Sequence, residues 1–403
     1  QENSALVLCS TQDVYNTRTS IANLLSMEPD SVRVQYHEGA GTFGHSCWDD
    51  TAQAAALMSS LAGSPVRVQL MRWDEHGWDT YGPAHIGKAR VSADRNGKMV
   101  SYEYEGWQHH WSLIETSEQT AKGTPAAEWP PFTAQQINPL TLGGMYDTPN
   151  RKLLNHHVPG LDYLKGAWLR SPLDLSFAFI SEQAIDDLAY RLGLDPWQFR
   201  QQNITNYHWL DVLNAAAEAA NWVPAPAAQN TASTGVVRGR GIGVGTHLAS
   251  YGGAVAEIEV DTATGEVKIL HLVGAIDAGL VVNTSNVENQ IIGQLVQTAS
   301  RMLLEEVTFN RTNVTSLDWA SYPILRFEQC PEITPVIVQR LDEFVDRTSQ
   351  RAFHAANIIN PARNAAFGKA FGNGKVLVHI ANQLTDRDGV RLPGQSKAAA
   401  PST

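Results

Sequence analysis

The sequence predicts an α+β protein whose helices and strands form mixed layers in two domains. The chain has 403 residues, of which 43% are hydrophobic and 18% charged, and it is long enough to bury a large core in two or three domains. Segments with alternating apolar residues are interleaved with segments whose apolar residues recur every three or four positions, the periods of strands and helices. Asn96-Gly97 lies between two alternating segments, and such a hairpin signature favours mixed layers over a purely parallel sheet.

Strand and helix patterns alternate in the first part of the chain. Residues 32–36 alternate apolar and polar side chains, as a half-buried strand does. The small-residue segment 51–61 follows Asp49 and Asp50, two acids that suit the positive end of a helix. We therefore expect strands at 5–9, 32–36 and 66–71, a helix at 51–61, a hairpin at 90–104 and an irregular connection at 115–150.

Three helices are expected next. Apolar residues recur at helical spacing over 180–192. Ser181 is a suitable cap for this helix and Gly193 a suitable end. Asp195-Pro196 starts a second helix, because proline suits a first turn, and residues 209–222 form a third.

The pattern changes after residue 235. Residues 254–260 and 266–273 are predicted to be strands joined by a turn, and 287–303 carry one apolar stripe of a long helix. The preceding Pro-, Ala- and Thr-containing segment marks a boundary. We expect a first domain at 1–222, a linker at 223–235, a second domain at 236–393 that is aberrant from about 344, and a flexible tail at 394–403.

Charge and cysteine usage restrict the partners. With 41 acidic and 30 basic residues, the net charge is −11, which argues against nonspecific binding to nucleic acid or anionic membranes. No apolar segment approaches the ~18 residues that suggest a membrane span. The three cysteines are far apart, which argues against a disulfide framework or a Cys-rich zinc site and fits a reducing compartment.

The start of the chain also carries information about processing. It opens at Gln1 with no basic-then-apolar signal segment, and residues 5–9 already have the pattern of a strand. We therefore expect a processed protein or a fragment without its N-terminal part, so that the first domain is incomplete. The cytoplasm is the favoured location, with the periplasm as the alternative.

Three motifs suggest chemistry but fit it poorly. Gly44–Trp48 partly matches a cysteine-protease signature, but no histidine lies at the required ~130–150 residues downstream of the cysteine. Asp74–Asp79 with His85 lacks the His-Glu-x-x-His spacing of a zinc helix and is expected to follow a strand. Gly239–Gly245 precedes no helix that could hold a pyrophosphate, so we expect a strand closely approached by another backbone or a ligand.

The glycine-rich loop Gly39–Gly44 is the strongest local candidate. It joins a predicted strand to a predicted helix. Its small residues allow backbone N–H groups to face an anion without obstruction by side chains. By itself the loop is equally compatible with an anion-binding nest and with a plain tight turn.

The residues around this loop resemble the molybdopterin-binding subunit of the xanthine dehydrogenase/aldehyde oxidase family. That family combines a Ser-Thr-Gln segment, a Val-Arg-Val strand and a Gly-Gly-Gly-Phe-Gly loop, which correspond to Ser10–Gln12, Val32–Tyr36 and Gly39–Gly44. Further matches follow in the same order along the chain: Leu169–Pro172, Glu182–Ala189, Asp195–Arg200, Asn283 with Glu288–Gly293, and Tyr322–Ile324. Bacterial members that act on aldehydes or N-heterocycles are the most similar.

The resemblance implies two mixed α+β domains of the molybdenum-cofactor-binding type. It also implies a molybdenum hydroxylase that oxidatively hydroxylates an aldehyde or an N-heterocycle. The cofactor would be molybdenum-molybdopterin, with the cytosine dinucleotide form as one option. Electrons would pass to an iron–sulfur subunit or domain and on to FAD or a haem-containing cytochrome on partner subunits.

The resemblance further assigns roles to individual residues, for which surface or packing roles are the alternatives. Gln12 would donate an amide hydrogen bond to an oxo group of the molybdenum, and Gln290 would bind the pterin. Arg170 would face the substrate and stabilise developing negative charge. Cys47 stands where purine-oxidising members carry an acid, which argues against a purine substrate. The loop residues expected to surround the cofactor are Gly41, Thr42, Phe43 and Gly44, with no side chain ligating the metal directly.

Two departures from the family pattern bear on activity. The family's Gly-Gln-Gly segment, which cradles the pterin, is absent from this chain. The Gly-x-Gly-Glu motif, whose glutamate is the general base, is also missing after Val338–Arg340, and residues 344–371 resemble nothing in the family. Glu343 is the last glutamate of the chain. Asp342, Glu343 or Asp346 could replace the base only if the fold brings one within hydrogen-bond reach.

The sequence therefore predicts a molybdenum hydroxylase subunit whose general base is not found. One alternative is a catalytically impaired or non-catalytic scaffold of the same fold. A second alternative is a truncated or frame-altered product that folds only in part.

Overall fold

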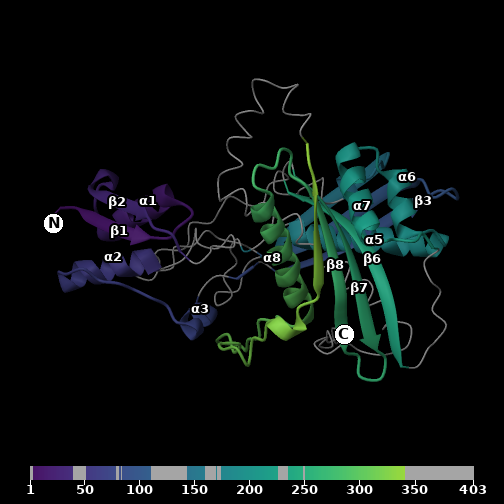
Figure 1. Cartoon of the computed structure of the whole chain (residues 1–403). Coiled ribbons are helices and arrows are strands. Elements are labelled where there is room, and N and C mark those ends of the chain that lie inside the picture. The colour runs from purple at the N-terminus through teal and green to yellow at the C-terminus, as the bar shows by residue number, and fades with distance from the viewer. Residues whose placement is uncertain are drawn as a thin grey trace, which may run out of the picture.

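The computed structural model describes residues 3–39, 51–78, 81–82, 84–109, 143–158, 169, 174–225, 235–247 and 250–340. Within these ranges the chain forms three sheets with helices packed against them, which confirms the predicted α+β class. A two-stranded sheet lies at one end of the molecule, and a three-stranded and a four-stranded sheet lie together at the other (Figure 1).

The N-terminal unit is built around two parallel strands. Strand β1 (Ala5–Cys9) pairs with β2 (Val32–Tyr36), from Ala5 opposite Val32 to Cys9 opposite Tyr36. Both strands were predicted at these bounds. Helices α1 (Val14–Leu25) and α2 (Thr51–Ala62) cover one face and share a small core with Val7 and Val32. A short 3-10 turn, Pro29–Ser31, leads into β2.

The strand expected at 66–71 is wrong. These residues have no regular structure, and the chain continues into helix α3 (Arg72–Trp78). The alternating pattern is present, but no strand pairs with it in the part of the chain that the structure describes, and an alternating pattern alone does not supply hydrogen bonds. The Asp74 side chain stabilises the start of this helix, because it accepts a hydrogen bond from the Met71 backbone N–H at 3.0 Å. Residues 74–78 therefore lie in a helix and do not follow a strand. Across the described residues, no three potential metal ligands cluster together.

The three-stranded sheet contains the predicted hairpin. Strands β3 (His85–Ala93) and β4 (Met99–His109) are antiparallel, and Gly97 adopts a φ of 81° in the turn between them. Strand β5 (Asn150–Val158) pairs with β4 in parallel and was not predicted. The expected irregular connection at 115–150 lies outside the described residues up to 142.

Three helices follow, close to their predicted positions: α5 (Asp174–Leu192), α6 (Pro196–Asn203) and α7 (Tyr207–Ala219). Ser181 is not a cap, because α5 begins seven residues earlier and Ser181 is fully buried in mid-helix. Gly193 ends the helix as predicted, with a φ of 67°. Asp195 caps α6 by accepting hydrogen bonds from the backbone N–H groups of the first turn.

The four-stranded sheet has the order β6-β7-β8-β9. Strands β6 (Val236–His247), β7 (Ser250–Asp261) and β8 (Val267–Asp277) form an antiparallel meander, which confirms that Gly239–Gly245 lies in a strand. Strand β9 (Glu332–Val338) adds to β8 in parallel after the long helix α8 (Thr284–Leu303). A 3-10 turn at Phe327–Gln329 precedes β9.

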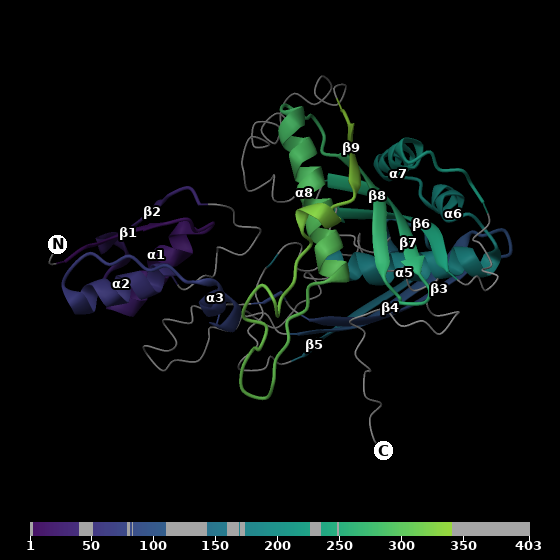
Figure 2. The ribbon, with the colours of Figure 1, turned by 60° about the horizontal axis from the view of Figure 1, so that its bottom comes forward.

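Two cores lie on the two faces of this sheet. Helix α7 packs on the face that carries Val255 and Val273, together with α5, α6 and the β3–β5 sheet. Helix α8 packs on the opposite face through Val287, Ile291 and Leu295, the stripe predicted for it (Figure 2). The first core thus includes residues from both sides of 223–235, and the division into domains there stays a prediction. No helix within the described ranges combines the length and apolarity needed to cross a membrane.

Candidate functional site

The carboxyl ends of β1 and β2 bring two of the family-like segments together. Because the strands are parallel, the segments that follow them leave the same edge of the sheet. The His37 backbone N–H donates to the Cys9 carbonyl at 2.8 Å, which extends the pairing beyond β2. A Cβ added to Gly39 would lie 2.9 Å from the Ser10 Cβ, so this close approach requires glycine. The Ser-Thr-Gln segment and the start of the glycine-rich loop therefore lie side by side.

Gln12 lies at this edge, immediately before helix α1. Its side chain is exposed. The turn that presents it is fixed, because Thr11 Oγ1 accepts a hydrogen bond from the Asp13 N–H at 3.2 Å and bonds Thr17 Oγ1 at 3.1 Å. Asp13 in turn caps α1 by accepting from the Asn16 N–H at 3.1 Å. These local hydrogen bonds hold in place the backbone that carries the exposed Gln12 amide.

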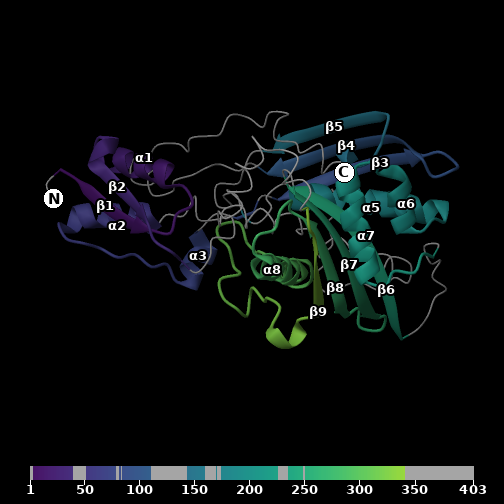
Figure 3. The same ribbon diagram turned by 45° about the horizontal axis from the view of Figure 1, so that its top comes forward.

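Gln290 lies on the second turn of α8 and is half-buried. Asn283 caps this helix by accepting a hydrogen bond from the Asn286 N–H at 3.0 Å, and the first turn contains no acid. In each view, α8 lies between the β1–β2 unit and the four-stranded sheet (Figures 1 and 3). Gln12 and Gln290 thus belong to different elements in neighbouring parts of the molecule.

The described donors fit a large anionic cofactor such as molybdopterin. Two amide side chains, Gln12 and Gln290, can donate and accept hydrogen bonds. The exposed, acid-free first turn of α8 offers the positive end of a helix, which favours a phosphate or pterin oxygen. The glycine at position 39 leaves room at the strand edge for close approach of backbone. These features agree with the group that the resemblance implies.

Most of the remaining site predictions fall outside the described residues. This holds for the loop residues Gly41, Thr42, Phe43 and Gly44, for Cys47, for Arg170, and for Asp342, Glu343 and Asp346. The choice between an anion-binding nest and a tight turn at 39–44 therefore stays open. The missing general base also stays a prediction.

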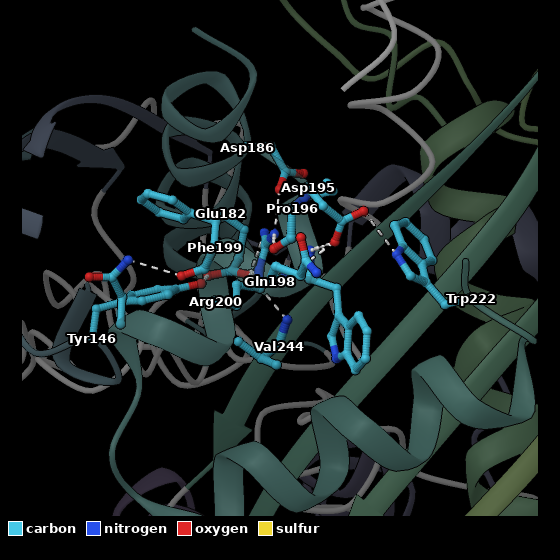
Figure 4. Close-up of polar contacts among 12 residues, drawn as sticks. Tyr146, Glu182, Asp186, Asp195, Pro196, Gln198, Phe199, Arg200, Trp222 and Val244 are labelled. Atoms are coloured by element: carbon cyan, nitrogen blue, oxygen red, sulfur yellow. Dashed lines mark hydrogen bonds and ion pairs between the residues drawn. The ribbon is translucent and has the colours of Figure 1, made fainter. Parts of the chain in front are cut away.

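The matched segments 182–189 and 195–200 form a buried ion cluster rather than a binding site (Figure 4). Arg200 is fully buried and pairs with Glu182 at 3.0 Å and with Asp186. Glu182 also accepts hydrogen bonds from the Tyr146 hydroxyl at 2.8 Å and from the Val244 backbone N–H at 3.1 Å. Burial by itself lowers the pKa of Arg200, but Asp186 and Tyr146 raise it, so that the net pKa lies above its usual value. The cluster joins α5, α6 and β6 in the shared core.

A second polar cluster ties β9 to the segment that leads into α8. Asp277 is buried and accepts hydrogen bonds from His208 Nδ1 at 2.6 Å and from Arg340 Nε at 2.7 Å. The Gln339 side chain accepts from the Val281 N–H at 2.8 Å and donates to the Val281 carbonyl at 3.1 Å. The chain is thereby fixed at the point where the family's Gly-x-Gly-Glu motif would begin.

Sequence reasoning missed a group of four uncharged polar side chains on the β3–β5 sheet, the polar quartet. His85 Nε2 bonds the Tyr104 hydroxyl, and Tyr104 donates to Asn155 Oδ1 at 3.4 Å. Asn155 Nδ2 donates to Gln108 Oε1 at 3.2 Å. The four residues come from three strands, and no short motif connects them, so only the strand register could have revealed the group.

His85 should make the protein less stable in mild acid. Burial lowers the pKa of His85 to about 4, from 6.5 in the unfolded chain. The unfolded state therefore binds more protons between these values, so stability is complete above pH 6.5 and falls as the pH decreases towards 4. Between pH 7.5 and 5, urea unfolding should show a loss of about 2 kcal/mol for the wild type relative to His85→Phe. Parallel pH profiles for the two proteins would contradict this expectation.

Comparisons with known proteins identify the family of the chain. Residues 1–204 match one molybdopterin cofactor-binding domain family and residues 183–331 match a second. The chain is 30% identical to a nicotinate dehydrogenase subunit of Pseudomonas putida, over 84% of this chain and 29% of that protein. It is 26% identical to the aldehyde oxidoreductase molybdenum-binding subunit PaoC of Escherichia coli, over 66% of this chain and 38% of that protein. The chain thus spans less than half of the length of these relatives.

Solved structures show the same fold. The crystal structure of quinoline 2-oxidoreductase from Pseudomonas putida 86 superposes with a TM-score of 0.75 at 12% identity, over 95% of this chain and 70% of that one. The aldehyde oxidoreductase of Desulfovibrio gigas gives a TM-score of 0.70 at 15% identity, over 94% of this chain and 56% of that one. The two matched domain families together cover most of the sequence. The chain therefore belongs to the molybdopterin cofactor-binding family, in the group of molybdenum-binding subunits of the xanthine dehydrogenase/aldehyde oxidase type.

Proposed function

We propose that this chain forms the cofactor-binding part of a molybdenum hydroxylase that oxidises an aldehyde or an N-heterocycle. The observation that carries the proposal is the convergence of Ser10–Gln12 and Gly39 at one edge of β1–β2, where the approach to Ser10 requires a glycine. Relatives named as nicotinate dehydrogenase, aldehyde oxidoreductase and isoquinoline 1-oxidoreductase subunits support the two substrate classes.

The residues of this chain would bind and orient the cofactor. Molybdenum-molybdopterin, in either its simple or its cytosine dinucleotide form, would supply the redox chemistry. The Gln12 amide would donate a hydrogen bond from the edge of β1–β2, and Gln290 would hold the pterin at the start of α8. Arg170 would stabilise negative charge that develops on the substrate. Backbone N–H groups of 41–44 would complete the cradle, and Cys47 would line the substrate pocket.

Electron transfer would require partners. Three relatives carry names of subunits, which supports assembly with other chains. We propose an iron–sulfur subunit as the first acceptor and an FAD- or cytochrome-containing protein as the second. We propose the cytoplasm as the location, with the periplasm as the alternative.

The second candidate is a non-catalytic scaffold of the same fold. It is favoured by the sequence after Glu343, which contains no glutamate and therefore no Gly-x-Gly-Glu motif. Loss of a general base typically lowers the rate by about 10²–10⁴-fold. A chain that folds cooperatively but neither holds the cofactor nor turns over would fit this candidate.

Metal and pterin analysis separates the candidates. The chain should be produced in a host that makes molybdopterin, and molybdenum and pterin should be measured per chain by mass spectrometry. We expect stoichiometric loading, with dye reduction by an aldehyde if the chain is catalytic. Metal-free but cooperatively folded protein would support the scaffold and contradict cofactor binding.

Substitution of Gln290 tests the cofactor site directly. Gln290→Leu should lower the pterin content about tenfold, because it removes the amide hydrogen bonds but keeps the helix. Gln294→Leu, one turn further along α8 and also half-buried, is the matched control and should leave the content unchanged. Equal pterin content in the two variants would show that Gln290 does not bind the pterin.

A further inference from the structure

Helix α3 connects the N-terminal unit to the rest of the described structure. The unit has a core of its own around Val7, Ile21 and Val32, separate from the two cores on the faces of the four-stranded sheet. After α2 the chain runs to α3, which lies beside the segment between α8 and β9 in all three views (Figures 1, 2 and 3). The contacts of α3 therefore help to set the position of the N-terminal unit relative to α8.

Arg72, the first residue of α3, lies over the ring of Trp319. Its guanidinium carbon is 3.4 Å from the centre of that ring, within the ~6 Å of a cation–π contact. Arg72 Nε is buried and makes no hydrogen bond to a described residue, so the indole ring is the described partner of this side chain. Trp319 itself is 51% exposed. A half-exposed tryptophan over an arginine indicates a contact between two separate elements rather than core packing.

Two further contacts follow along the same helix. The His76 ring meets the Tyr322 ring edge-on, with 4.5 Å between the ring centres. A Cβ on Gly77 would lie 3.4 Å from the Leu317 side chain, so α3 packs directly on this segment. His76 lies four residues after the start of the helix and therefore on the side that carries the arginine. The six residues of these contacts are named the α3 clasp: Arg72, His76 and Gly77 with Leu317, Trp319 and Tyr322.

The turn that carries Trp319 is held by its own hydrogen bonds. The Asp318 carboxylate accepts from the backbone N–H groups of Ala320 and Ser321 at 3.1 and 2.8 Å, and from the Ser321 hydroxyl at 2.7 Å. The Ser321 hydroxyl and N–H lower the pKa of Asp318, so the carboxylate stays ionised in the neutral range. The Tyr322 N–H donates to the Asp318 carbonyl at 2.9 Å. Local bonds thus fix both aromatic residues of the clasp independently of α3.

The same segment is attached to the end of α8. Ser300 in the last turn of α8 accepts a hydrogen bond on its Oγ from the Leu325 N–H at 3.0 Å. The Tyr322 hydroxyl donates to Glu305 Oε2 at 2.8 Å, and the Glu305 N–H donates to the Ser300 carbonyl at 3.2 Å. The α3 clasp therefore joins the N-terminal unit to α8 through a segment that is itself fixed to this helix.

We propose that the α3 clasp positions the N-terminal unit against α8, so that Gln12 and Gln290 reach one cofactor. The assignment rests on the proposed function and adds Arg72 and Trp319 to it as positioning residues. In this role neither residue touches the cofactor, and both act through the placement of Gln12. A closed clasp raises the apparent affinity, because a site whose competent state is only partly populated binds its ligand more weakly by that fraction.

Double electron–electron resonance on the 403-residue chain tests the clasp without need of the cofactor. After the three native cysteines are replaced by serine, spin labels are attached at Tyr15→Cys in α1 and Glu288→Cys in α8, two exposed positions. We expect one narrow distance distribution, which Arg72→Met and Trp319→Leu each broaden. The double variant should broaden it no further, because the two side chains act on each other. Arg72→Lys keeps a cation for the ring and should retain the narrow distribution.

Arg240→Met is the matched control. Arg240 lies over the Trp222 ring at 4.6 Å and pairs with Glu257 on the neighbouring strand β7, away from α3. This variant also loses a cation–π contact, but it should leave the distance distribution unchanged. Equal broadening by Arg240→Met and Arg72→Met would show that the effect is not specific to the clasp and would overturn the proposal.

Pterin content is the second readout, measured on chains with their native cysteines from a host that makes molybdopterin. Arg72→Met and Trp319→Leu should each lower the pterin retained after dialysis about two- to fivefold, the effect of one exposed cation–π contact. Arg72→Lys and Arg240→Met should retain the wild-type content. Urea midpoints that match the wild type would show that the lost pterin does not reflect a lost fold.

An equally narrow distribution in the wild type and the clasp variants would overturn the clasp. Broadening without loss of pterin would overturn its role in cofactor binding. Should both clasp variants fail to fold, the wild type decides, because a broad distribution there overturns the proposal and a narrow one supports it. A wild type without pterin would mean that the proposed function fails, whereas the distances would still decide whether the clasp holds the two parts together.

Discussion

Replacing Arg200 with methionine should lower the free energy of unfolding by about 3–5 kcal/mol. The substitution leaves Glu182 and Asp186, which are 1% and 7% exposed as side chains, without the guanidinium that neutralises them. An uncompensated buried charge is costly, and methionine restores volume but no hydrogen bonds. Urea unfolding followed by circular dichroism measures the loss.

The exposed pair Arg90–Glu103 provides the control. Its nitrogen and oxygen lie 3.1 Å apart, but the side chains are 85% and 36% exposed. Arg90→Met should therefore cost less than about 1 kcal/mol. Similar losses for Arg90→Met and Arg200→Met would show that burial does not control the strength of these pairs.

Gly253→Ala should destabilise the protein by about 3 kcal/mol, the upper end of the usual cost of overpacking. A Cβ at this position of β7 would lie 2.5 Å from the Val212 carbonyl oxygen of α7. That oxygen belongs to helical backbone, so relief requires a shift of the whole helix away from the sheet. The melting temperature and the urea midpoint should both fall.

Gly293→Ala is the matched control on α8. A Cβ there meets nothing within 4 Å, and alanine is the better helix former. The substitution should stabilise the protein by up to about 1 kcal/mol. Destabilisation by Gly293→Ala would indicate that the outer side of α8 is covered, and no loss in Gly253→Ala would contradict the packing of α7 on β7.

Elements with a local signal could be predicted from the sequence. The β3–β4 hairpin follows from Asn96-Gly97, α6 from Asp195-Pro196, and the end of α5 from Gly193. Strand β5 was missed because its pairing is parallel and its partner β4 is far away in the chain. The strand predicted at 66–71 was wrong for a different reason. The alternating pattern is present there, but no neighbouring strand pairs with it among the described residues.

For the candidate site, the sequence could predict the position of a segment only where that position follows from the order and direction of the strands. Two parallel strands place Ser10–Gln12 and Gly39 at one edge. The matches around Glu182 and Arg200 identify the family, but they stabilise the core rather than bind a ligand. Gln108 gave no signal, because a glutamine in a strand becomes informative only when its burial and its partners are known.

The parallel addition of β9 to β8 has a consequence for biosynthesis. Residues 278–331 must be translated after β8 before β9 is available, which takes about 3–10 s at ordinary elongation rates. During this interval a nascent chain already has the meander of β6, β7 and β8, with the outer edge of β8 unpaired. Such an edge can recruit another polypeptide. Slower initiation of translation, or production together with chaperones, should therefore raise the yield of monomeric protein. A nascent chain that is released before β9 is made should instead aggregate into inclusion bodies.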